Sequence, residues 1–123
     1  MAYRRFTVAA AGDAAGDGTF YTPYLSGFIE SIQYIKVDYA DTVDFTITAD
    51  VTGETIWTES NVTAAVIKHP RAATHSTAGV ASVYVAAGSA VNDYVALGRD
   101  RVKIVIGTAG VSKTGSFVVT VRD

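Results

Sequence analysis

The chain has only two histidines, His69 and His75, and they are its first candidates for metal or catalytic chemistry. A pair six residues apart fits neither the helical nor the strand spacing of a metal-ligand pair, and no third ligand accompanies it. Ser76 follows His75, but THSTAG lacks the G-x-S-x-G spacing that exposes a nucleophilic serine at a strained turn. We therefore expect neither a metal site nor a hydrolase here, and we interpret the histidines as loop residues hydrogen-bonded to the backbone.

Two glycine-rich segments have some features of ligand-binding loops. Asp13 and Asp17 lie in GDAAGDG, which lacks the alternating Asp/Asn pattern of a calcium loop and is typical of a turn or a flexible arm. Residues 107–115, GTAGVSKTG, lack the phosphate-loop spacing because Ser112 rather than Gly precedes Lys113. They also connect two predicted strands, whereas phosphate is held at a helix N-terminus. Neither segment predicts an ion site.

Four carboxylates could in principle supply the pair that hydrolyses glycosidic bonds: Glu30, Asp38, Asp44 and Glu59. Each occupies a polar position of an alternating segment, where a charged side chain is normally solvated. We therefore expect no catalytic, cofactor-binding or metal-binding residues, and we expect that the protein is not an enzyme.

Tyrosine could recognise a partner without catalysis. The chain has seven tyrosines, and Tyr21 and Tyr24 flank Pro23 in FYTPYL. A tyrosine combines an apolar ring with a polar hydroxyl, which suits a protein interface and also suits stacking on a sugar. The tyrosines leave both alternatives open.

The elements that carry these residues are predicted to be β-strands. Val and Ile together make 25 of the 123 residues, Thr makes 15 and Leu only two, and β-branched residues favour strands over helices. The length fits one domain over residues 1–123. A net charge of −2 offers nothing that attracts nucleic acid or anionic lipid. The absence of cysteine suits a reducing compartment, and we expect neither a signal peptide nor a membrane helix.

Periodicity places several strands. Residues 43–51 alternate with Val43, Phe45, Ile47, Ala49 and Val51 on the buried face, and Thr52-Gly53 turns the chain into a hairpin partner at residues 54–58. Trp57, the only tryptophan, is predicted to fill the core. In residues 28–39 the apolar parity changes, which requires a bulge or a strand that crosses between two sheets.

In the C-terminal half we expect a strand beginning at Val83 and Val85, a short apolar run at 93–97, and a hairpin between residues 102–106 and 117–121. The spacing predicts a single antiparallel, jelly-roll-like β-sandwich with little or no helix. We expect residues 1–18 to form an N-terminal arm and residues 61–79 a long loop that reaches neighbouring subunits.

Five segments carry a resemblance to a known group of proteins: LSGFIESI, ADTVDFTIT, TGETIW, DRVKIVI and KTGSF. In these segments, and over most of its length, the chain resembles small proteins of tailed bacteriophages that are encoded among the head and tail structural genes. The shared segments are strands and turns without catalytic residues. The resemblance therefore implies a structural role in the virion.

From this resemblance we expect a head-decoration (cement) protein that binds and stabilises the capsid shell. Its partners would be the major capsid protein or other virion proteins, without nucleic acid or membrane. By analogy we expect a homo-oligomer, with a trimer as the guess, made in the host cytoplasm and located in the virion. Two alternatives remain open: a neck or tail component, such as a head–tail adaptor or tail accessory protein, and a carbohydrate-binding module for host adsorption.

Overall fold

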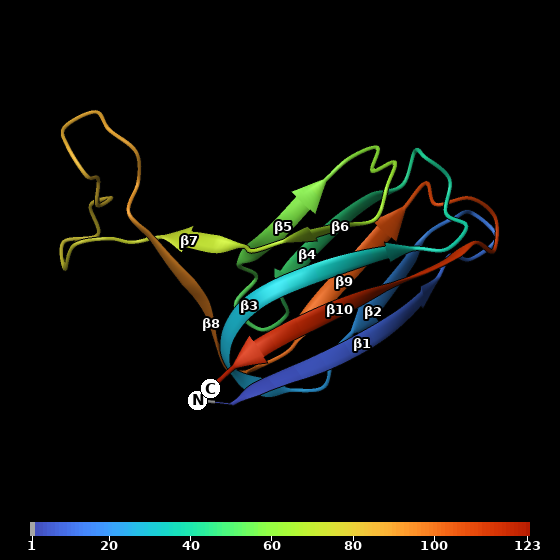
Figure 1. Ribbon diagram of the computed structural model, residues 1–123, viewed down its shortest axis with the longest axis horizontal. Coiled ribbons are helices and arrows are strands. Elements are labelled where there is room, and N and C mark those ends of the chain that lie inside the picture. The colour runs from blue at the N-terminus through green and yellow to red at the C-terminus, as the bar shows by residue number, and fades with distance from the viewer. Residues whose placement is uncertain (1) are drawn as a thin grey trace.

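The computed structural model describes residues 2–123 of the protein, which form ten β-strands and no helix (Figure 1). The strands are β1 (Tyr3–Ala11), β2 (Gly18–Tyr21), β3 (Leu25–Lys36), β4 (Asp44–Ala49), β5 (Thr55–Glu59), β6 (Val66–Lys68), β7 (Arg71–Ala73), β8 (Asn92–Asp100), β9 (Val102–Gly107) and β10 (Thr114–Arg122). The all-β prediction is confirmed. No helix of these residues is long and apolar enough to cross a membrane.

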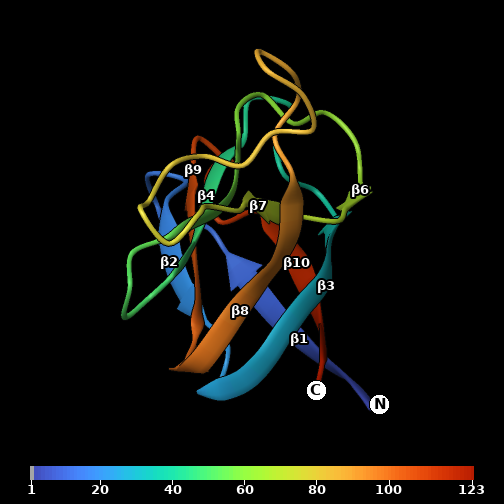
Figure 2. The ribbon, with the colours of Figure 1, turned by 90° about the vertical axis from the view of Figure 1, so that its left-hand side faces the viewer.

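The strands form two antiparallel sheets that pack as a sandwich (Figures 1 and 2). The larger sheet has the order β1-β10-β3-β8-β7, and β6 also pairs with β3. The smaller sheet has the order β2-β9-β4-β5. Most connections pass from one sheet to the other, so neighbours within a sheet are rarely neighbours in sequence. The predicted sandwich is confirmed, and its jelly-roll connectivity stays a prediction.

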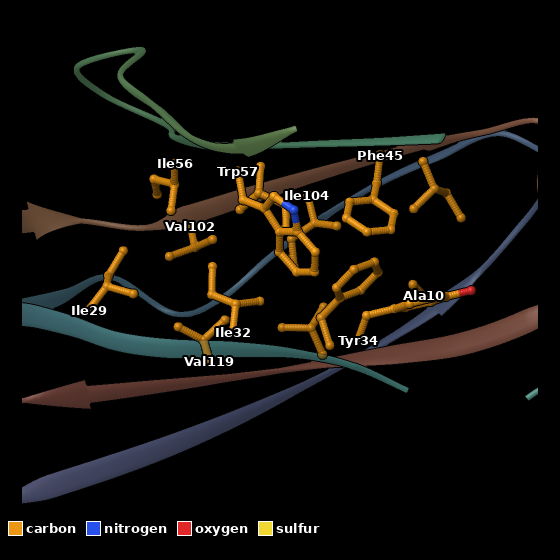
Figure 3. Packing of buried hydrophobic residues seen from close by; sticks show 14 of the residues in the cluster. Ala10, Ile29, Ile32, Tyr34, Phe45, Ile56, Trp57, Val102, Ile104 and Val119 are labelled. Carbon is orange, nitrogen blue, oxygen red and sulfur yellow. The ribbon is translucent and has the colours of Figure 1, made fainter. Parts of the chain in front are cut away.

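The core lies between the two sheets and is built mainly from alternate residues of β1, β3, β4, β8, β9 and β10, together with Ile56 and Trp57 of β5 (Figure 3). Ile47 of β4 faces Ile104 of β9 across the register, and both are fully buried. The ring of Phe45 packs edge-on against Trp57, with centroids 4.7 Å apart, and lies 5.2 Å from the ring of Tyr34 in the opposite sheet. Aromatic pairs of this kind contribute about 0.5–1.5 kcal/mol beyond their buried area.

The predicted hairpin in residues 43–58 is present. β4 pairs with β5, the face with Phe45, Ile47 and Ala49 is buried, and Trp57 lies in the core as predicted. Val51 differs from the prediction, because it lies in the turn after β4 and is 69% exposed.

A change of phase is present in residues 28–39, and its cause is a bulge, but it lies at Glu30 rather than after Tyr34, and Phe28 and Val37 are exposed. On β10, Thr120 pairs with Ser31 and Val121 pairs with Ile29, so Glu30 is the additional residue. The buried positions shift there from the parity of Ile29 to that of Ile32. The alternative of a strand crossing between sheets is wrong, because β3 stays in the larger sheet throughout.

Two predictions for the C-terminal half are wrong. β9 and β10 do not form a hairpin, because β9 lies in the smaller sheet and β10 in the larger one. Val83 makes only an isolated bridge to Ala90, and Val83 and Val85 are both exposed rather than half-buried in a strand. The short apolar run at 93–97 does form part of β8, which extends further, to Asp100.

The two segments expected to reach outward also differ from expectation. Within residues 1–18, Met1 lies outside the described residues, and the following segment is strand β1, paired along its whole length with β10 of the same chain. The loop at residues 61–79 contains β6 and β7 and returns partly to the larger sheet. The element that projects from the sandwich begins within this loop, at the end of β7, and continues beyond it to β8 (Figure 1).

Candidate functional site

The two histidines lie in separate local structures. His69 Nδ1 is 3.3 Å from the carbonyl oxygen of Glu30, and His75 bridges Ala81. Ser76 Oγ accepts hydrogen bonds from the N–H groups of Ala78 (3.2 Å) and Val80 (3.3 Å), so this hydroxyl shapes a turn. No group of three His, Cys, Asp or Glu residues within 2–123 could hold a metal ion.

The two glycine-rich segments pack against each other at one end of the sandwich. Asp13 Oδ1 accepts hydrogen bonds from the N–H groups of Ala15 (2.8 Å) and Asp17 (3.0 Å). The bonds from Asp17 and Ala15 lower the pKa of Asp13. The N–H of Ala109 donates to the carbonyl of Gly16 at 3.0 Å. Residues 107–115 therefore hold the turn at Asp13 and connect strands of two different sheets.

The four carboxylates considered for sugar hydrolysis serve different parts of the fold. Glu30 lies near two arginines described below. Asp38 accepts hydrogen bonds from the N–H and the hydroxyl of Thr114. Asp44 accepts hydrogen bonds from the N–H of Asn61 and the hydroxyl of Thr108. Glu59 accepts a hydrogen bond from the indole N–H of Trp57. The contacts of Asp38 and Asp44 join separate parts of the fold, whereas that of Glu59 lies within β5.

Asp100 is a buried carboxylate that the sequence analysis did not single out. Its Oδ1 accepts hydrogen bonds from the N–H groups of Val51 (2.8 Å) and Arg101 (2.7 Å), and its Oδ2 lies 3.4 Å from the N–H of Thr52. Burial acts to raise the pKa of Asp100, but these backbone donors outweigh it and leave the pKa below its usual value. The residue therefore fixes the turn between β4 and β5.

The tyrosines divide into core and surface groups. Tyr34 and Tyr39 are buried, and burial raises the pKa of Tyr34 to about 12. Tyr21 and Tyr24 are exposed, with the Arg101 guanidinium carbon 3.9 Å and 4.9 Å from their ring centroids. Arg101 Nε is also 2.8 Å from Asp50 Oδ2. This arginine therefore lies against the two rings that a sugar would use.

The segment that runs from the end of β7 to the start of β8, residues 72–92, which we call the projection, extends from one end of the sandwich (Figures 1 and 2). It contains no Asp, Glu, Lys or Arg. Its exposed large apolar residues are Val80, Val83, Tyr84 and Val85. An exposed apolar surface without charges is typical of a surface that meets another protein.

The projection has a defined backbone of its own. The N–H of Thr74 donates to Val91 at 2.9 Å, and the N–H of Ser82 donates to Thr74 at 2.9 Å. Two further backbone hydrogen bonds close tight loops: the N–H of Ser76 donates to the carbonyl oxygen of Val80 at 2.8 Å, and the N–H of Tyr84 donates to that of Ser89 at 3.1 Å. An isolated two-stranded element is only marginally stable in water, so a partner surface would stabilise it further.

At the base of the projection, β3 changes its partner. Its first half pairs with β8 up to Ile29 and its second half pairs with β6 from Ile32, with the bulged Glu30 between them. Arg71 Nη1 donates to the carbonyl oxygens of Glu30 (3.2 Å), Pro70 (2.8 Å) and Ile29 (3.4 Å). One guanidinium thus satisfies carbonyl groups at the place where the sheet divides.

Charge and aromatic contacts reinforce this base. The Arg71 and Arg122 guanidinium carbons each lie 4.0 Å from the Tyr94 ring centroid, and Glu30 lies 3.9–4.0 Å from nitrogens of both arginines. Phe28 packs edge-on against Tyr94 at 6.1 Å. The cluster fixes the direction in which the projection leaves the sandwich.

The predicted loop at residues 61–79 includes only the first part of the projection, and sequence reasoning missed the rest because Val83 and Val85 alternate like a half-buried strand. The signal that could have identified it is the run without charged residues from 72 to 92, in a chain with 22 charged residues. No protein-family model matches this chain, and no curated protein matches it either.

Proposed function

We propose that this protein is a non-enzymatic structural protein of a bacteriophage particle, and that it decorates the head as a cement protein. The observation that carries the proposal is the charge-free, apolar projection held in a fixed direction on a rigid sandwich. A projection of this kind is suited to binding a neighbouring protein surface. The resemblance of the strand segments to phage structural proteins is the reason for placing that neighbouring surface on a phage particle.

The projection exposes Val80, Val83, Tyr84 and Val85 to water, and burying them against a partner would be favourable. Burying apolar surface contributes about 25 cal/mol per Å², and interface centres are depleted of charged residues because an unpaired buried charge is costly. The projection offers apolar surface for burial and has no charged residue that burial would leave unpaired. Many copies that each contribute a modest free energy would stabilise a shell substantially.

A neck or tail position is the first alternative, and the same projection would serve it. Copy number separates the two proposals, since a decoration protein is present in hundreds of copies and an adaptor in a dozen or fewer. A carbohydrate-binding role would rest on the exposed Tyr21 and Tyr24. Their contacts with Arg101 make them less available for stacking on a sugar.

The proposal is tested with phage particles from which the gene for this chain has been deleted. We expect the deleted particles to lose infectivity at lower temperature and under milder osmotic shock, and we expect purified protein to restore both in many copies. Unchanged particle stability, or a dozen or fewer copies in the intact particle, would rule out a cement role. Glycan binding that requires Tyr21 and Tyr24 would instead favour adsorption.

A further inference from the structure

A hollow at the start of β3 is lined by two arginines and by no carboxylate. Its volume is about 350 Å³, and its lining consists of Arg4, Tyr24, Leu25, Ser26 and Arg99. This volume falls within the range of about 300–1,000 Å³ that is usual for binding pockets. Three other hollows of the described surface each have at least one Asp or Glu in their lining. The hollow at β3 is therefore the one whose lining charge attracts an anion.

Ser26 of β3 brings the two arginines together. Its carbonyl oxygen accepts a hydrogen bond from Arg4 Nη2 at 2.6 Å, and its hydroxyl oxygen accepts one from the N–H of Arg99 at 2.9 Å. Arg4 belongs to β1, whereas Arg99 lies near the end of β8, which runs beside the start of β3 (Figure 2). The pair of cations is therefore a product of the fold and not of one local sequence.

The pairing of β3 with β8 is irregular at this point. Between two successive pairs, Leu25 with Asp100 and Gly27 with Leu97, β8 has one residue more than β3. Arg99 has a φ of 51°, and of the described non-glycine residues with positive φ it alone lies within a strand. Left-handed backbone is unfavourable for such a residue, and bulges commonly redirect a side chain at a binding site. This irregularity places the Arg99 side chain at the hollow.

The charges around the hollow leave one cation without a partner. Arg4 Nη2 is 3.1 Å from Asp123 Oδ1, and Arg101, which lies nearby against the ring of Tyr24, pairs with Asp50. The Arg99 side chain has neither a hydrogen bond nor an ion pair within residues 2–123. One carboxylate balances the remaining positive charge, whereas a phosphate group carries about −1.5 to −2 near neutral pH and exceeds it. The charge balance therefore favours a carboxylate.

The uncharged part of the lining suits a carboxylate at the end of a side chain. The ring of Tyr24 is 59% exposed, and the Arg101 guanidinium carbon lies 4.9 Å from its centroid. This ring can cover the methylene groups of a glutamate, and its hydroxyl can donate a hydrogen bond. A guanidinium binds a carboxylate through two parallel, charge-assisted hydrogen bonds. The hollow thus matches both parts of an acidic side chain.

We propose that this hollow binds an acidic segment of a partner protein, with one carboxylate held by Arg99 and flanked by Arg4 and Tyr24. Arg99 supplies the binding charge, and Ser26 is a positioning residue that fixes the backbone of both arginine contacts. The site lies outside the projection and uses charge where the projection uses apolar surface. It extends the protein's binding capacity beyond the proposed function and does not rest on it.

The direct test is a titration of the isotope-labelled protein with a capped hexaglutamate peptide, followed through the backbone N–H signals of Ser26 and Arg99. We expect saturable shifts at these signals, and a dissociation constant lower by on the order of tenfold or more than that of inorganic phosphate. Capped hexaglutamine should produce no saturable shift. Phosphate that binds as tightly as the peptide would overturn the assignment to a carboxylate. A lack of saturable shifts with both anions would overturn the site.

A matched pair of variants separates a specific site from general attraction. Arg99→Gln removes the charge at the hollow, and Arg5→Gln removes an equal charge from the outer face of the larger sheet. Unchanged dispersion of the remaining N–H signals checks that both variants fold. We expect Arg99→Gln to raise the dissociation constant of hexaglutamate by on the order of tenfold, and Arg5→Gln to raise it by about twofold or less. Equal losses in the two variants would overturn the proposal.

These measurements need only the purified protein and a synthetic peptide. Their failure would therefore leave the cement proposal standing, since that proposal depends on particle stability and copy number. Conversely, particles that are equally stable without the protein would not alter the binding of hexaglutamate at Arg99.

Discussion

The guanidinium carbon of Arg71 lies 4.0 Å from the ring centroid of Tyr94, and these two residues are direct partners in the pairing of β7 with β8. The contact stands where the projection leaves the sheet. Arg71 also donates to the carbonyl oxygens of Ile29 and of the bulged Glu30 in β3. One side chain therefore couples the direction of the projection to the irregularity in the larger sheet.

Replacement of Arg71 by alanine should loosen the projection. The change removes hydrogen bonds to Glu30 and Pro70 and the contact with Tyr94, and we expect a loss of about 1–3 kcal/mol in the free energy of unfolding. Amide exchange should accelerate in residues 72–92 more than in β4 or β9. Arg71→Lys, which keeps the charge without the planar fork, should be intermediate. Exchange that rises uniformly over the whole chain would contradict a local role.

Two buried tyrosines should respond differently to loss of the hydroxyl. Tyr39 donates a hydrogen bond to the carbonyl oxygen of Ala10, so Tyr39→Phe should cost about 0.5–1.5 kcal/mol. No residue within 2–123 hydrogen-bonds the Tyr34 hydroxyl, so Tyr34→Phe should be neutral or slightly stabilising. Urea denaturation of the two variants tests the difference, and the reverse order would be inconsistent with this packing.

Acid should destabilise the fold through carboxylates whose pKa is lowered. The pKa values of Asp13, Asp38 and Asp100 all lie below the ordinary value of 3.8. A lowered folded-state pKa contributes stability that is present above the unfolded value and is lost as pH falls through the folded value. We expect a constant urea midpoint from about pH 7 to about pH 5 and a decline below about pH 4.

Asp100→Asn serves as the matched variant for this acid transition. It should be less stable at neutral pH, because a neutral amide accepts the backbone donors more weakly. It should also lose less stability on acidification than the wild type. A wild-type protein whose urea midpoint stays constant down to about pH 2 would show that these hydrogen bonds contribute little.

The sequence predicted the parts of the fold whose signal is local. Alternation from Val43 to Ala49 predicted β4, and the Thr52-Gly53 turn predicted its pairing with β5. The same logic failed for β9 and β10. Residues 107–115 look like a hairpin connection, but whether a turn stays in one sheet or crosses to the other depends on long-range packing, which a turn sequence does not specify.

The candidate site was harder to predict for a related reason. Alternation at Val83 and Val85 indicates a face that needs covering, but it does not say whether the cover comes from the same chain. The contacts of Arg71, Glu30 and Tyr94 join residues that are far apart in sequence and become neighbours only where β3 divides. Local sequence patterns therefore cannot predict these long-range contacts.

The most direct test of the assembly role compares two equally exposed valines. Val85 in the projection is 68% exposed and Val51 in the turn after β4 is 69% exposed, so aspartate at either site should leave the fold intact. Purified variants are added to particles that lack the protein, and the bound copies are counted. We predict that Val85→Asp reduces binding by on the order of tenfold or more, because a charge is then buried in the interface, and that Val51→Asp binds like the wild type. Equal binding by both variants would contradict the account.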